Sequence, residues 1–237
     1  MKTIIPLQSN LLQALRLFVS KDETRYVLNG VLLEVVSPSQ FVLAATDGRS
    51  LFAVRIAEEE MVTDDPFEPF QVIMPIELLK KITGKARLFH VELDCSDDGS
   101  EMITLRDVRK EITYSQKAIV GDHPKWRQTC PTAPCGHPKY LTRYNAEFAQ
   151  KFSKAAQILG VAEYQGITLR QVDTNGVMLV EAGVQWSGYD CVAILMPMGM
   201  KDKTNEALEL STPSWAIAPV LPTPEIVETP AVETPSA

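Results

Sequence analysis

A single order of expected secondary structure, β-α-β-β-β, occurs three times in roughly the first 200 residues of the chain. The first copy reads as a strand at 2–7, a helix at 9–19 and strands at 26–36, 41–48 and 51–57. The second copy reads as a strand at 70–75, a helix at 75–83 and strands at 89–95, 101–108 and 110–118. The third reads as a strand at 139–144, a helix at 145–159 and strands at 166–172, 176–182 and 189–198. This repeat predicts an α+β protein in which the helices cover one face of antiparallel sheets.

The ends and faces of these elements agree with the repeat. On the first helix, one face carries Leu11, Leu12, Leu15, Phe18 and Val19, and the other carries Ser9, Gln13, Arg16 and Ser20. Pro75 suits the first turn of the second helix, and Asn145 suits the N-cap of the third. Turn dipeptides stand between strands at Asn29-Gly30, Asp47-Gly48, Asp98-Gly99 and Asn175-Gly176.

The segment 211–237 has a different composition from the rest of the chain. Proline recurs every few residues, and there is no glycine, lysine or arginine. Because proline interrupts both helices and central strands, we expect an extended, disordered tail here. The folded body should then end between residues 200 and 210.

The balance of charge is acidic, but the predicted helices are basic. The chain has 23 Lys and Arg against 30 Asp and Glu, a net charge of −7. This balance argues against a protein that coats nucleic acid, unless its basic residues are gathered on one surface. Such a surface is suggested by the outer faces of the three helices, which carry Arg16, Lys80, Lys81, Lys151 and Lys154, with Lys21 and Lys85 just beyond the ends of the first two. The plainer interpretation is that these residues are only the solvated sides of helices.

Cysteine usage and hydropathy indicate an ordinary cytoplasmic protein. The four cysteines are scattered, and a chain of this size does not need disulfides in a reducing compartment. Cys130, Cys135 and His137 form a possible metal-binding cluster, but their spacing is not that of a zinc module, so we predict no metal and no cofactor. The sequence contains neither a signal peptide nor an apolar run long enough to cross a membrane.

Three stretches resemble the beta subunit of bacterial DNA polymerase III, the replicative sliding clamp. The stretches "TRYVLNGVLLEV" and "LAATDGRSLFAVRI" are similar to the start of the middle domain of that family. The segment "IVGDHPKWRQTCP" resembles the end of the same domain, although Gly121 and Asp122 stand in reversed order. The ending "AILMPMGM" resembles the Met-Pro-Met end of the family, with Gly199 and Met200 replacing its final Arg-Leu.

The resemblance implies a function as well as a fold. Clamps of this family are rings of β-α-β-β-β halves, in which the helices line a hole for duplex DNA and the strands lie outside. They catalyse no reaction but tether polymerases and other DNA-processing proteins, which bind through short peptides in an apolar pocket. Carried over to this sequence, the pocket residues are Leu28, Thr46, Gly48, Arg49, Leu51, Pro131, Ile194, Leu195, Met196, Pro197 and Met198. Met side chains adapt to varied partners, and Pro197 would prevent further strand pairing. The alternative interpretation is that 189–198 is an ordinary terminal core strand.

The chain is shorter than a clamp of this family. Residues 1–131 correspond to the whole middle domain, 132–210 to a C-terminal domain shortened to one half, and 211–237 to the tail. Two family chains of six halves each complete a ring, so a chain of three halves would need four copies. We therefore expect a homo-oligomer, with duplex DNA, a polymerase and a possible clamp loader as partners and no membrane. The shortening also suggests a phage or mobile-element origin.

The sequence also suggests two other functions. The stretch "ATDGRS" superficially resembles the Asp-(Thr/Ser)-Gly of aspartic proteases, but its order differs and no second copy exists to supply a second carboxylate. Asp47 is better explained as a turn residue, so no enzyme is predicted. The second alternative is a clamp-like adaptor or decoy that binds peptides without encircling DNA.

Overall fold

The computed structural model describes residues 2–56, 61–63, 67–83, 88–95, 101–130, 144–161, 166–171, 177–183 and 185–198. All of them lie in the unit that spans Met1–Thr204. The expected strand at 139–143, Lys85, Pro131, Cys135, His137 and the tail 211–237 fall outside the described residues. No helix in the described ranges is long and apolar enough to cross a membrane.

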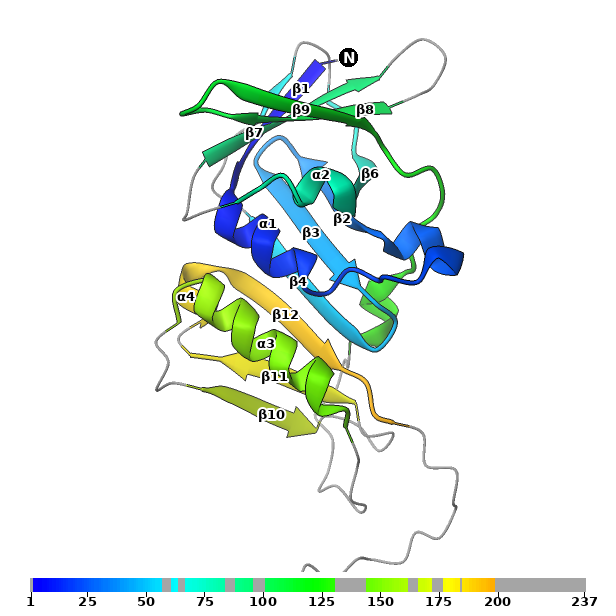
Figure 1. Cartoon of the computed structure of the whole chain (residues 1–237), viewed down its shortest axis with the longest axis vertical. Coiled ribbons are helices and arrows are strands. Elements are labelled where there is room, and N and C mark those ends of the chain that lie inside the picture. Colours follow the sequence, from blue (N-terminus) through cyan, green and yellow to red (C-terminus); the bar gives the residue numbers. More distant parts are fainter. Residues whose placement is uncertain are drawn as a thin grey trace, which may run out of the picture. The chain divides into compact units, whose positions relative to one another are not determined.

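The larger of two antiparallel sheets takes strands from all three copies of the repeat, which we call modules 1, 2 and 3 (Figure 1). Its order is β10 (Ile167–Gln171), β11 (Met178–Ala182), β12 (Asp190–Leu195), β4 (Ser50–Ile56), β3 (Gln40–Thr46), β2 (Gly30–Ser37) and β6 (Phe70–Pro75). The smaller sheet has the order β5 (Val62–Thr63), β1 (Lys2–Gln8), β7 (Leu88–Cys95), β8 (Glu101–Asp107) and β9 (Ile112–Lys117).

Modules 1 and 2 exchange their first strands. β1 opens module 1 but pairs with β7 of module 2, with Ile5 opposite Val91. β6 opens module 2 but pairs with β2 of module 1, with Leu32 opposite Ile73. Neither module can form its sheet without the other, so the exchange interlocks them.

Modules 1 and 3 join edge to edge. β12 runs antiparallel to β4 over six residue pairs, from Asp190 opposite Arg55 to Leu195 opposite Ser50. At one end of this junction, Nε of Arg55 donates to a carboxylate oxygen of Asp190 at 2.7 Å. The larger sheet therefore continues across the boundary between the two modules.

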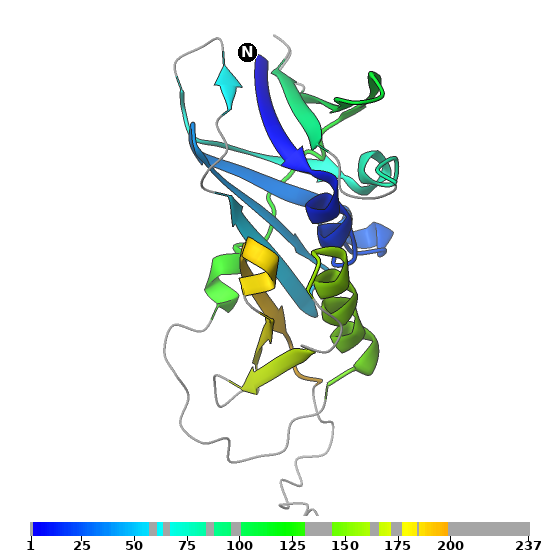
Figure 2. The ribbon, with the colours of Figure 1, turned by 90° about the vertical axis from the view of Figure 1, so that its left-hand side faces the viewer.

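The main helices lie on one face of the sheets, as Figures 1 and 2 show from two directions. They are α1 (Ser9–Arg16), α2 (Ile76–Leu79) and α3 (Ala146–Ile158), while the short α4 (Gln185–Gly188) precedes β12. The main core fills the space between helices and strands, where Phe18 stacks on Phe52 with ring centroids 5.1 Å apart and also contacts Phe152 at 4.9 Å. Such aromatic contacts join α3 and the end of α1 to β4.

Some expected elements differ from the observed ones. The strand expected at 26–36 starts only at Gly30, because Glu23–Leu28 forms a 3₁₀ helix, η1, whose first turn is capped by the Asp22 side chain accepting from the Thr24 N–H. The helices expected at 9–19 and 75–83 are shorter, since α1 ends at Arg16 and α2 at Leu79. Ser9 and Ser20, expected on a polar face, are both buried.

Candidate functional site

A second apolar cluster lies on the face of the larger sheet that the helices leave uncovered. Strand residues alternate between the two clusters: Leu33, Leu43 and Phe52 join the main core, whereas their neighbours point the other way. We call the second set the outer cluster, and its buried members are Leu32, Val42, Ala44, Leu51, Ala53, Ile73, Trp126, Val177 and Ile194. The 3₁₀ helix η2 (Trp126–Thr129) covers part of it, on the side away from α1 and α3 (Figure 2).

The turn from Thr46 to Leu51 borders this cluster and is held by its own side chains. One carboxylate oxygen of Asp47 accepts the N–H groups of Arg49 at 2.8 Å and Ser50 at 2.7 Å. The Thr46 hydroxyl accepts from the Gly48 N–H at 3.0 Å and donates to the Ser50 carbonyl at 2.9 Å. Gly48 has a φ of 83°, a value that favours glycine. Asp47 is thus committed to building the turn.

The end of β12 lies directly beside this turn. Ile194 is opposite Leu51 in the ladder, and the Met196 N–H donates to the Arg49 carbonyl at 2.8 Å. Pro197 has no N–H with which to continue the pairing. Ile194 is fully buried and Met196 partly so, while Met198 is 47% exposed. The two segments that the resemblance assigns to one peptide pocket are therefore adjacent in the fold, and we call their junction the peptide seam.

Two of the predicted pocket residues are placed differently from the rest. Leu195 points to the helix side and is fully buried in the main core, because its neighbour Ile194 occupies the outer face. The prediction that Leu195 lines the pocket is wrong for this reason. Leu28 is buried at the end of η1, next to Val27, which packs against the outer cluster.

Sequence reasoning missed three residues near the seam. Trp126 is 8% exposed within the outer cluster, and the guanidinium of Arg127 lies 4.4 Å from its ring centroid. Arg127 also binds Glu34 with both terminal nitrogens, at 2.9 and 2.5 Å, which fixes η2 to β2. Arg25 lies over the turn, since a Cβ added to Gly48 would be 2.7 Å from its Nη1. Trp126 could have been found from the sequence, because it is an aromatic residue inside the stretch 119–131 that resembles the family.

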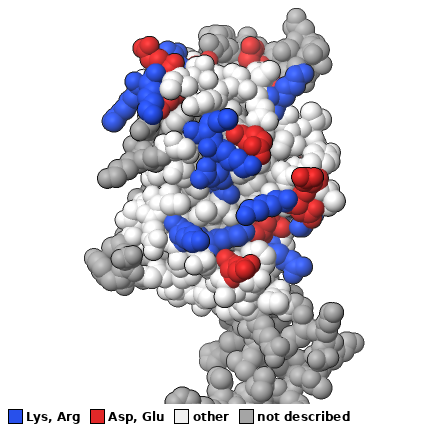
Figure 3. All heavy atoms as spheres, in the orientation of Figure 1, with Lys and Arg blue, Asp and Glu red and all other residues white. Residues whose placement is uncertain are grey.

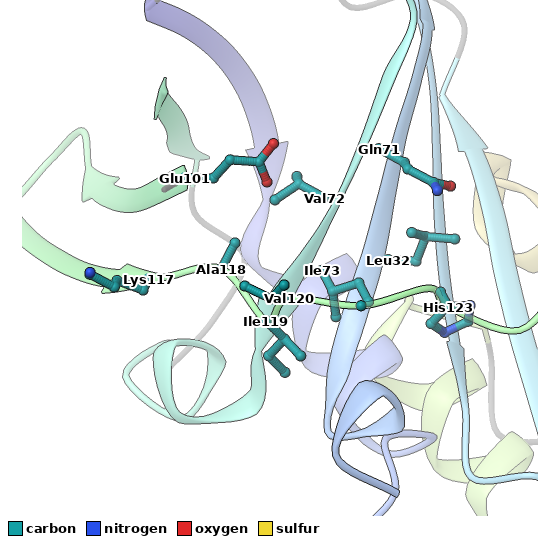
Figure 4. Close-up of a pocket in the computed structure, with 11 residues that line it drawn as sticks. Leu32, Gln71, Val72, Ile73, Glu101, Lys117, Ala118, Ile119, Val120 and His123 are labelled. Carbon is teal, nitrogen blue, oxygen red and sulfur yellow. The ribbon is translucent and has the colours of Figure 1, made fainter. Parts of the chain in front are cut away.

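A pocket of about 260 Å³ borders the outer cluster at β6 (Figure 4). It lies where residues 117–121 run beside Val72 and Ile73, with the Ile119 N–H donating to the Ile73 carbonyl. His123 lines one side, and burial lowers the pKa of its imidazole. The pocket is distinct from the seam, because neither the Thr46–Leu51 turn nor the end of β12 lines it.

The helix face carries most of the predicted basic residues, but not all of them are free. Figure 3 shows Lys and Arg side chains gathered where α1, α2 and α3 lie in Figure 1, with acidic side chains among and beside them. Lys80 pairs with Glu77 at 2.6 Å, and a guanidinium nitrogen of Arg16 donates to the Leu79 carbonyl at 3.4 Å. Among the predicted basic residues that the structure describes, Lys21, Lys81 and Lys154 are exposed and have no ion pair to another described residue.

Lys151 does not face solvent as predicted. Its side chain is 24% exposed, and its ammonium group donates to the Asp47 carboxylate in the turn at the seam. Burial alone would raise the pKa of Asp47, but hydrogen bonds from Lys151 and from the N–H groups of Ser50 and Arg49 outweigh it and leave that pKa below its usual value. Lys151 therefore acts within the fold, and the prediction that it contacts DNA needs correction.

Of the cluster of Cys130, Cys135 and His137, only Cys130 belongs to the part of the chain that the structure describes. Cys130 and Cys191 are free thiols there, and no group of three potential ligands comes together among the described residues. Burial raises the pKa of the Cys130 thiol, so it is mostly protonated near neutral pH.

Comparison with known proteins finds likeness in structure only. No protein-family model and no curated protein sequence matches the chain. Solved structures do match, among them the DNA polymerase III beta subunit of Thermotoga maritima, with a TM-score of 0.60 and 14% identity over 83% of this chain and 66% of that one. A sliding clamp of Pseudomonas aeruginosa bound to griselimycin gives 0.56 and 17%, covering 83% and 65%. The Helicobacter pylori beta clamp bound to a DNA ligase peptide gives 0.55 and 12%, again covering 83% and 65%.

These matches define the class of fold. The chain has the antiparallel-sheet architecture of bacterial sliding clamps and spans about two thirds of their length. In particular, the neighbours are beta subunits of DNA polymerase III, so the clamp-like α+β fold expected from the sequence is confirmed in shortened form.

Proposed function

We propose that this protein is a sliding-clamp-like processivity factor that tethers DNA-processing proteins to duplex DNA. In this proposal, residues 1–131 act as a clamp middle domain and 132–210 as half of a C-terminal domain, in the cytoplasm. The supporting observation is that one sheet carries basic helices on one face and the peptide seam at its other face. A tether needs both surfaces at once and needs no catalytic group.

The DNA-facing surface is proposed to be the helix face. Lys21, Lys81 and Lys154 are exposed there without ion pairs to described residues. Contacts from such side chains to phosphates carry no sequence information and are weakened by salt. A few weak contacts suit a protein that must slide, and three unpaired lysines on the helix face let an acidic protein approach DNA by that face.

The partner-binding surface is proposed to be the peptide seam. Leu51, Ile194 and Trp126 supply a buried apolar floor, and the flexible side chains of Met196 and Met198 border it. The clamp of Helicobacter pylori binds a DNA ligase peptide, which supports peptides of polymerases and other DNA-processing proteins as ligands here. Arg49, exposed at the rim, would favour peptides with acidic residues beside their apolar anchors, whereas Arg25 there is paired with Asp22 at 3.0 Å.

Encirclement of DNA requires several copies of this chain. Three modules make a quarter of a ring of twelve, so four copies are the simplest closed assembly. A clamp loader belongs to this proposal as a partner, because a closed ring has to be opened before it can admit duplex DNA.

The experiment reverses the charge of the three unpaired lysines on the helix face and leaves Lys151 unchanged. A Lys21→Glu, Lys81→Glu, Lys154→Glu variant should shorten the products made by bacterial DNA polymerase III on a primed single-stranded circle. The matched control reverses Arg106, Arg109 and Lys110, which change the net charge equally but lie at the β8–β9 hairpin. Equal product lengths for both variants, with wild-type protein stimulating synthesis, would contradict the proposed DNA face.

The alternative function is an adaptor or decoy that binds peptides without DNA. The net charge of −7 and the engagement of Lys80 and Lys151 in ion pairs favour it. An adaptor would keep peptide binding and give no stimulation of synthesis by the wild-type protein.

A further inference from the structure

The strand β9 forms an open edge of the smaller sheet. It pairs with β8 on one side, and no described strand pairs with it on the other. Its sequence, ITYSQK, contains neither proline nor glycine, so six consecutive residues can pair. An edge of this kind is a template for a further strand.

One exposed apolar side chain lies on this strand, since Ile112 is 42% exposed. Figure 4 shows Lys117 at the end of the strand and Val120 on the segment that follows it, beside Ile73. Tyr114, in the middle of the strand, is partly buried and packs against the main core. A strand added at this edge would cover apolar surface as well as satisfy backbone groups.

The junction between modules 1 and 3 shows which kind of strand pairs with such an edge. β4, β9 and β12 are each the last strand of a module, and β4 pairs antiparallel with β12. Because β4 and β12 hold equivalent places in their modules and run antiparallel, an approximate local twofold axis relates them. β9 is the third equivalent strand, and none of the described strands is left to pair with it.

We propose that β9 is a self-association edge and that its partner is β9 of a second copy of this chain. The two strands run antiparallel about a twofold axis at Ser115, so that Ser115 of one copy lies opposite Ser115 of the other; β4 and β12 run antiparallel in the same way within one chain. Such an isologous contact uses the same patch on both copies and closes at a dimer. It supplies one of the junctions that encirclement would require, but the argument rests on the sheet edges and not on DNA binding.

Charge at the two ends of β9 suits this arrangement. Glu111 precedes the strand and Lys117 ends it, and both side chains are exposed. In this register, Lys117 of each copy lies opposite Thr113 of the other and diagonal to Glu111, so opposite charges come within reach of each other at both ends. The Arg55–Asp190 pair stands at the corresponding place in the junction within the chain.

The outer edge of β10 is a different kind of edge. β10 is the first strand after its helix, as β2 and β7 are, and those two strands pair with the exchanged strands β6 and β1. By this equivalence, the outer edge of β10 is the place where the opening strand of a module pairs. It is not a place where two terminal strands pair. It therefore serves as an internal control.

The test measures the mass of the full chain by light scattering between about 1 and 100 µM. The wild type should reach at least the mass of a dimer, and that of a tetramer where the proposed ring also closes. Ser115→Lys and Ser115→Glu should each weaken association at least about tenfold, because like charges then meet at the twofold axis. A mixture of the two variants should restore the dimer, and Thr168→Lys on β10 should leave it unchanged. Ser115 is exposed, so the fold should survive these changes, which circular dichroism checks.

Three results would overturn the proposal: a monomer throughout this range, dimers of Ser115→Lys and Ser115→Glu as stable as wild type, or loss of the dimer in Thr168→Lys. Oxidation of a Ser115→Cys variant gives a second readout, since a covalent dimer should form there and not from Arg106→Cys on β8. Binding of a clamp-binding peptide to the Ser115 variants should stay at the wild-type level. Loss of self-association is thereby separated from failure of the proposed tethering function.

Discussion

The ammonium group of Lys151 on α3 donates to the carboxylate of Asp47, 104 residues earlier in the chain. This contact ties module 3 to the Thr46–Leu51 turn of module 1, and the Met196 N–H to Arg49 carbonyl bond ties the same two modules a few residues away. A helix on the basic face thus supports the turn that borders the peptide seam. The position of that turn depends on both modules.

Replacing Lys151 should destabilise the protein far more than replacing its neighbour. Lys151→Met leaves the largely buried Asp47 carboxylate without its cation, at a cost of about 2 kcal/mol of unfolding free energy. Lys154→Met, on the same helix, should cost nearly nothing because Lys154 is exposed. Urea denaturation of both variants measures the difference, and equal midpoints would show that the pair contributes nothing.

Stability should fall in acid partly through Asp47. Its pKa is lowered in the folded state, so the unfolded state binds the proton more readily. The stabilisation is complete above the ordinary pKa of 3.8 and is lost as the pH falls through the lower folded value. The unfolding free energy, measured from neutral pH downwards, should therefore decline less steeply below pH 3.8 in Lys151→Met than in the wild type. The same slope in both proteins would contradict the assignment.

Gly48 and Gly166 form a matched pair for testing the turn. Both have positive φ, but a Cβ at Gly48 would meet Arg25 at 2.7 Å, whereas nothing lies within 4 Å of one at Gly166. Each change to alanine should cost about 1 kcal/mol of stability from backbone strain. Only Gly48→Ala should also weaken peptide binding, because Arg25 must move. Equal peptide affinities of Gly48→Ala and Gly166→Ala would show that Arg25 does not contribute to the rim of the seam.

The two described thiols should differ in reactivity. Burial, with a smaller contribution from Asp190, raises the pKa of the Cys191 thiol strongly, while Cys130 is less buried. With Cys95 and Cys135 replaced by serine, a disulfide reagent at pH 8 should modify Cys130 faster than Cys191, because the stronger rise in the pKa of Cys191 leaves it less thiolate. Equal labelling rates for the two thiols would contradict this order.

The sequence alone predicts the modules well but not how they join. Periodicity identifies the strands and helices because each depends on nearby residues, and the short motifs correctly indicated the clamp fold. The exchange of β1 and β6 could not be predicted, since pairing between strands of similar pattern is decided by tertiary packing.

The errors at the candidate site have the same origin. Leu195 and Ile194 are equally apolar, and only the pairing with β4 decides which one faces outwards. Lys151 and Lys154 are alike in sequence, and only the folded position of Asp47 distinguishes them. The part of η1 expected as a strand was misassigned because the cap formed by Asp22 outweighs the β-rich composition of 26–28.

The most direct measurement is the affinity of a fluorescein-labelled DNA ligase peptide of the clamp-binding type for the full chain. Saturable binding should occur with wild type, and Met196→Glu should weaken it at least about tenfold, because a charge then stands among apolar side chains at the seam. Val62→Glu, a change at a 63% exposed position on β5, should bind as wild type does. No binding by the wild type, or equal binding by a folded Met196→Glu variant, would contradict the proposal that the junction of β4 and β12 receives partner peptides.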